Sequence, residues 1–178
     1  MRWVWLDRII ELEKSRRLVA VRTVSWGEDL LHDHFTKEQV ADGRSVPCMP
    51  HTLVIEGMAQ AAGVLAGHAN DFEEKVILAK IGKAIFEPGQ LATPGSVIRH
   101  TATIERIDKS GAATSGVVTL IPPGGGPNDA RPFARIDLMF SHVDQNRQGL
   151  EFPEHNFVFT EQFMALLDVS GIDRPAGF

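Results

Sequence analysis

The sequence predicts an α+β fold in which an antiparallel sheet wraps around one long central helix. Residues 50–68 form a long run whose apolar side chains cover nearly the whole circumference of a helix. That pattern is typical of a helix buried on most sides. The chain after this run consists of short apolar or alternating segments, which are typical of strands. A curved sheet around the helix gives these elements one common core.

The segments that precede the helix are shorter and less regular. Residues 3–12 have mixed apolar spacing, which fits a short helix or a strand. Residues 18–24 are rich in β-branched side chains and predict a strand. Residues 28–46 show no clear period and predict a loop with room for one short helix. The helix itself is expected to start at Pro50, because proline suits a first turn and the run is too long for a strand.

The segments that follow the helix predict strands at residues 76–81, 84–86, 97–107, 112–121 and 133–142. A turn at 109–111 makes two of these strands a hairpin, and a Gly/Pro-rich loop occupies 122–127. The tail is less regular, with one helix expected around 161–167. We therefore expect one domain at residues 1–143 and a C-terminal extension at 144–178.

Composition excludes several classes of function. The formal net charge of -5 argues against a nucleic-acid-binding protein, which needs positive charge to neutralise phosphates. Cys48 is the single cysteine, so neither an intramolecular disulfide nor a thiolate metal cluster is possible. His32 and His34 are the closest pair of histidines, and no carboxylate or cysteine stands at metal-ligand spacing with them on a helix. We expect no metal and no cofactor.

The start of the chain lacks the long apolar core of a secretory signal. The longest apolar stretch, residues 61–66, is far too short to span a bilayer. We therefore expect a soluble cytoplasmic protein that does not associate with a membrane.

Glu56 is the strongest indication of chemistry. Together with Gln60, Gly63 and Gly67, it forms a polar and small stripe on one face of the apolar helix. A carboxyl group among apolar neighbours loses water, which favours its protonated form and suits a general acid. The alternative is a structural glutamate that hydrogen-bonds Gln60 one turn on, or an arginine from elsewhere.

The helix resembles that of a known enzyme family. Met49-Pro50 and the run 53–65 resemble the helix motif of the 3-hydroxyacyl-(acyl carrier protein) dehydratases of fatty-acid synthesis. His34-Phe35 resembles the family's catalytic His-Phe pair. Further similarity lies in the segments at residues 6–12, 19–24, 77–86 and 94–95. The resemblance covers most of residues 6–142 and implies the hot-dog fold, an antiparallel sheet wrapped around one long central helix.

The resemblance also implies a mechanism and an assembly. His34 would remove the C2 proton of a 3-hydroxyacyl thioester, and protonated Glu56 would donate to the departing 3-hydroxyl, leaving a trans-2-enoyl thioester. Backbone N–H groups at the helix start would polarise the thioester carbonyl. Substrate-binding positions would then be Met49, Pro50, His51, Gln60 and Gly63. The substrate would be carried on acyl carrier protein or CoA. The family pairs the histidine of one subunit with the acid of another, which implies a homodimer or a trimer of such dimers.

Two departures from the family pattern leave other functions open. His51 stands where the family has a glycine, and Thr36-Lys37 replace its Pro-Gly, with a longer loop before the helix. His51 is a candidate substitute base. One alternative function is a hot-dog acyl thioesterase in which Glu56 activates water. Another is a non-catalytic acyl-carrier or lipid-binding module.

Overall fold

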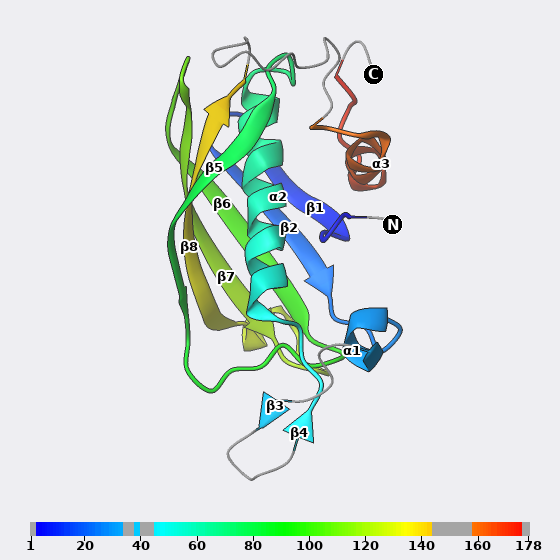
Figure 1. Ribbon diagram of the computed structural model, residues 1–178. Helices are drawn as coiled ribbons and strands as arrows, with labels where there is room; N and C mark the ends of the chain where they lie inside the picture. The colour runs from blue at the N-terminus through cyan, green and yellow to red at the C-terminus, as the bar shows by residue number, and fades with distance from the viewer. Residues whose placement is uncertain (1–2, 34–37, 40–44, 144–157, 176–178) are drawn as a thin grey trace.

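A computed structural model of the protein describes residues 3–33, 38–39, 45–143 and 158–175, and for residues 32, 33, 38, 39, 45 and 46 it describes the backbone only. Six antiparallel strands curve around one long helix, α2 (His51–Ala69), as Figure 1 shows. The sheet has the order β1-β2-β6-β7-β8-β5. Its strands are β1 (Arg8–Glu13), β2 (Arg17–Thr23), β5 (Val76–Phe86), β6 (Val97–Asp108), β7 (Gly111–Ile121) and β8 (Arg131–His142). This arrangement confirms the predicted α+β hot-dog fold.

Helix α2 is the centre of the core. Pro50 is its N-cap, and most side chains from Val54 to Gly67 are buried against the sheet, so few positions face solvent. Gly57 allows the helix to approach β6 closely, because a Cβ at this position would lie 2.7 Å from Nε2 of His100. The nearly continuous apolar character of the helix therefore reflects contacts on several sides, as the sequence predicted.

Smaller elements precede the central helix. A short helix, α1 (Asp29–Asp33), and two-residue strands β3 (Glu38–Gln39) and β4 (Ser45–Val46) occupy the segment predicted as a loop with room for one helix. The first segment of the chain, for which helix and strand were both open, contains strand β1.

Strand β5 is one continuous strand, whereas its sequence suggested two short runs. The pairing of β5 with β8 shifts register between Leu78 and Lys80 and again between Ile81 and Lys83. Each irregularity interrupts the alternation of side chains, which is why the sequence pattern breaks while the strand continues. β5 forms one edge of the sheet.

The other edge, β1, is covered by helix α3 (Glu161–Ser170), as Figure 1 also shows. The backbone N–H of Ile9 donates to the hydroxyl of Ser170 at 2.9 Å, which ties β1 to the end of this helix. Gly171 ends the helix in the left-handed conformation, with φ of 72°. The helix predicted around 161–167 is confirmed and extends to Ser170.

Candidate active site

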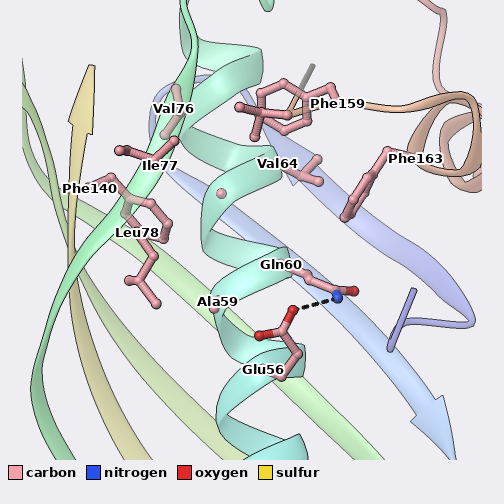
Figure 2. A pocket seen from close by; sticks show the side chains of 12 residues that line it. Glu56, Ala59, Gln60, Val64, Val76, Ile77, Leu78, Phe140, Phe159 and Phe163 are labelled. Atoms are coloured by element: carbon pink, nitrogen blue, oxygen red, sulfur yellow. Dashed lines mark hydrogen bonds between the residues drawn. The ribbon is translucent and has the colours of Figure 1, made fainter. Parts of the chain in front are cut away.

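An apolar cavity of about 260 Å³ lies between α2, β5 and the segment that leads into α3 (Figure 2). Three of the four residues in the predicted stripe on α2 line it, namely Glu56, Gln60 and Gly63. The remaining walls are Ala59, Val64, Val76, Ile77, Leu78, Phe140, Val158, Phe159 and Phe163. Glu56 is the only ionisable side chain among these lining residues, so one carboxyl group faces an otherwise apolar space.

The carboxyl group of Glu56 is half-buried and held by two N–H donors. Nε2 of Gln60 donates to Oε1 at 2.8 Å, and Nε1 of Trp3 donates to the same oxygen at 3.2 Å. Both bonds fix the orientation of the carboxyl group through a single oxygen. Among the described residues the other oxygen, Oε2, receives no such bond, so it is the oxygen left to meet a bound molecule.

Gln60 does more than contact Glu56. Its Nε2 also donates to the carbonyl oxygen of Trp3 at 2.8 Å, and its Oε1 accepts from the backbone N–H of Trp5 at 2.7 Å. The buried amide thus joins Glu56 to the N-terminal segment of the chain. The hydrogen bond between Glu56 and Gln60, one turn on, is therefore present, as the alternative of a structural glutamate expected. Glu56 also lines the cavity, so the bond does not remove it from that space.

The residues predicted at the helix start lie one to two turns before Glu56 and do not line the cavity. Met49 is buried, and its N–H donates to the carbonyl oxygen of Ala92 at 2.8 Å. The ring of His51 stacks on Phe86, with centroids 3.9 Å apart. Pro50, the N-cap, makes no side-chain capping bond. These three residues form a separate group at the positive end of the helix dipole.

His34 lies outside the described residues, as do Phe35, Thr36 and Lys37. Helix α1 ends at Asp33, directly before His34. Figure 1 places α1 at the end of the molecule where α2 begins.

Another histidine, His100, is fully buried beneath α2. Burial lowers the pKa of His100 to about 3, because the charged imidazolium would lose its hydration. Its Nδ1 has no hydrogen-bond partner among the described residues. A neutral imidazole packed against Gly57 is a structural part of the core and does not reach the cavity.

Nothing in the described ranges resembles a metal centre: no three His, Cys, Asp or Glu side chains are grouped closely enough to hold an ion. In the same ranges, no helix is both long and apolar enough to cross a membrane.

The sequence matches the family described as the FabA-like domain over residues 2–119, which is more than half of the chain. The chain belongs to the FabA-like family. This match includes the whole of α2 and ends within β7, so the segment from Val158 to α3 lies beyond it.

Curated relatives of this FabA-like protein include several named 3-hydroxyacyl-(acyl carrier protein) dehydratase FabZ. The relative from Campylobacter curvus is 35% identical over 115 residues, which cover 58% of this chain and 72% of the relative. The relative from Caldanaerobacter subterraneus subsp. tengcongensis is 30% identical over 113 residues, covering 63% and 73%.

Solved structures similar to the FabA-like protein share its fold. The dehydratase heterocomplex ApeI:P from Xenorhabdus doucetiae matches with a TM-score of 0.55 and 21% identity, covering 80% of this chain and 85% of that one. A hypothetical thioesterase with coenzyme A from Streptococcus pneumoniae matches with a TM-score of 0.55 and 7% identity, covering 78% and 87%. At these identities the likeness concerns the fold alone.

Sequence reasoning missed two contributions to this FabA-like site. Trp3 donates to Glu56, although no motif in the first residues of the chain indicates such a role. Phe159 and Phe163 line the cavity from the tail, whose irregular pattern predicted only a short helix. Long-range contacts of this kind leave no periodic signal in the sequence.

Proposed function

We propose that this FabA-like protein dehydrates 3-hydroxyacyl thioesters carried on acyl carrier protein to trans-2-enoyl thioesters, in fatty-acid or related lipid synthesis. The observation that carries the proposal is Glu56, a carboxyl group oriented by two N–H donors at an apolar cavity within the family's helix. An apolar space with one convergent acid suits a substrate that has a hydrocarbon chain and a single reacting oxygen.

In the proposed reaction, Glu56 is the general acid and His34 the general base. The imidazole of His34 takes the proton from C2, the electron pair forms the C2–C3 double bond, and the C3–O bond breaks. Oε2 of Glu56 gives its proton to the departing hydroxyl, so that water leaves. Acid and base are both needed, because the C2 proton is weakly acidic and hydroxide is a poor leaving group.

We assign the start of α2 to the thioester carbonyl. The enolate that develops on the carbonyl oxygen is negatively charged, and the positive end of a helix dipole stabilises such charge. Pro50 and His51 stand at this end, one to two turns from Glu56. That separation lets the thioester lie at the helix start while the acyl chain extends along α2 past Glu56.

We further propose that the active unit is a homodimer formed through β5. This strand is an edge of the sheet, and its large apolar side chains are exposed, with Ile81 at 46% and Ile85 at 55%. A long edge strand with exposed apolar side chains favours pairing with another strand. Ile77 and Leu78 of the same strand line the cavity beside Glu56, so a second copy on β5 would lie next to the acid. His34 of that copy would then complete the site.

Hydration of crotonyl thioesters, the reverse reaction, tests the proposal. The purified protein should consume the conjugated enoyl thioester on acyl carrier protein, and more slowly on CoA. Glu56→Gln keeps an oxygen that accepts from Trp3 and Gln60 but cannot transfer a proton, so the rate should fall by roughly 10²- to 10⁴-fold. His34→Asn should cause a similar loss.

Glu105→Gln is a suitable control, since Glu105 is an exposed residue of β6 that bonds Ser115 away from the cavity. Full activity of Glu56→Gln, or no hydration by the wild-type protein, would contradict the dehydratase function. Release of free thiol from an acyl thioester without hydration would instead identify a thioesterase. Tight acyl-thioester binding without either reaction would identify a binding module.

A further inference from the structure

We infer that the C-terminal segment Val158–Phe163 closes the far end of the acyl cavity and limits the substrate chain to about eleven carbons. The inference rests on the proposed function, which places the reacting C3 atom beside Glu56. It adds a size limit that comes from a segment beyond the family match at residues 2–119.

The closure results from the way Phe159 packs on α2. A Cβ at Gly67 would lie 2.5 Å from Cζ and 2.7 Å from Cε2 of Phe159, so the ring occupies the place of a side chain there. Phe72 supports the ring in an edge-on contact, with centroids 4.8 Å apart. Phe159 is only 3% exposed, so its ring is packed in place at this end of the helix.

Gly63 differs from Gly67 although both belong to the same stripe. A Cβ at Gly63 would meet only Cε1 of Phe140, at an ordinary contact distance of 3.6 Å, and the residue lines the cavity. Figure 2 shows Phe163 on the other side of α2 from Leu78 and Phe140, and its ring centroid is 6.1 Å from that of Phe159. The space along α2 is therefore open at Gly63 and closed at Gly67.

The length of helix between the acid and the last stripe position open to the cavity limits the chain length. That position is Gly63, since Phe159 covers Gly67, and seven residues of helix separate it from Glu56, a rise of about 10 Å. An extended chain advances by about 1.2 Å per bond, as a polypeptide backbone does, so about eight bonds fit beyond C3. The cavity volume of about 260 Å³ also lies below the roughly 300–1,000 Å³ typical of larger ligands.

The experiment compares saturated butyryl-, octanoyl-, dodecanoyl- and palmitoyl-CoA in a calorimetric binding assay, and the matching trans-2-enoyl thioesters in the hydration assay. Wild-type affinity should rise by about fourfold for each methylene up to octanoyl, as expected for about 0.8 kcal/mol per buried CH₂. It should not rise further for palmitoyl.

Three variants test the wall directly. Phe163→Ala and the milder Phe159→Leu should each increase palmitoyl affinity by at least tenfold relative to octanoyl. Gly63→Ala should lower octanoyl affinity and leave butyryl affinity unchanged, because its methyl group enters the cavity. Val169→Ala, on the exposed side of α3, should leave the whole series unchanged.

The outcomes separate the inference from the proposed function. Equal binding and turnover of octanoyl and palmitoyl thioesters by the wild type would overturn the end wall while leaving the dehydratase intact. An unchanged chain-length profile in both phenylalanine variants would overturn it as well. A size limit in binding without hydration at any length would support the wall and contradict the dehydratase function alone.

Discussion

The ring of Phe159 takes the place of a side chain at Gly67, where a methyl group would lie 2.5 Å from the Cζ atom. Four residues earlier on the same face, Gly63 leaves that space to the cavity. Two glycines of one helix stripe therefore have different physical reasons to be glycine.

The two glycines should respond oppositely to alanine. Gly63→Ala should raise the free energy of unfolding by about 0.5–1 kcal/mol, because alanine favours the helix and meets no clash. Gly67→Ala should lower it by about 1–3 kcal/mol, because the Phe159 ring must move out of a packed position. Urea unfolding of both variants measures the difference, and a Gly67→Ala protein as stable as Gly63→Ala would refute the contact.

Gln60 should act as a positioning residue for Glu56. Gln60→Met keeps the length of the side chain but removes the donor to Oε1. In the hydration direction Glu56 takes a proton from water and so starts as a carboxylate. A hydrogen bond to a charged group contributes about 1.5–3 kcal/mol, so kcat should fall by roughly 10- to 100-fold with little change in KM. Steady-state kinetics with crotonyl thioesters measure kcat and KM separately. Gln162→Met on α3 is the matched control, and a loss confined to KM would exclude the positioning role.

His100 should make the protein less stable in acid. Its folded pKa of about 3 lies below the unfolded value of 6.5, so the unfolded chain binds one more proton between these two pH values. The free energy of unfolding therefore decreases as the pH falls, by about 1.4 kcal/mol per unit.

Replacement of this histidine should remove that contribution. Between pH 7 and pH 5, His100→Leu should lose about 2 kcal/mol less stability than the wild type, measured by urea unfolding at both values. Identical pH dependence of the two proteins would show that the imidazole reaches solvent.

A charged residue on the edge strand should break the proposed dimer. Ile81 is 46% exposed in the single chain, so Ile81→Lys should leave the fold intact. The charge replaces an apolar contact on the edge strand, so association should be lost. Light scattering should report a monomer, and hydration activity should disappear with the partner's His34. Val169→Lys, at an exposed position of α3, should remain associated. An active monomeric variant would mean that one chain supplies both groups.

Much of this fold can be predicted from the sequence because the pattern of apolar residues is periodic. The apolar run of α2 and the alternation in β6 and β7 predict the helix and the hairpin, since each position faces one constant environment. Glu56, Gln60 and Gly63 can be predicted as cavity residues for the same reason, because they are polar or small exceptions within a regular apolar pattern.

The remaining features depend on contacts between distant segments. The bond from Trp3 to Glu56 spans 53 positions, and nothing in the local sequence indicates it. Strand β5 looked like two runs because its register shifts interrupt the side-chain alternation. The far wall of the cavity comes from a tail without a regular sequence pattern, so the contact between Phe159 and α2 is seen only in the folded chain.

The two ends of the cavity are encoded in separate parts of the gene, one in α2 and the other just before α3. Mutations near Val158 and Phe159 can therefore remodel one end of the cavity without altering the helix that carries the acid. Such a division would let natural selection, or an engineer exchanging only the tail, adjust the accepted chain length while the elimination chemistry is inherited intact.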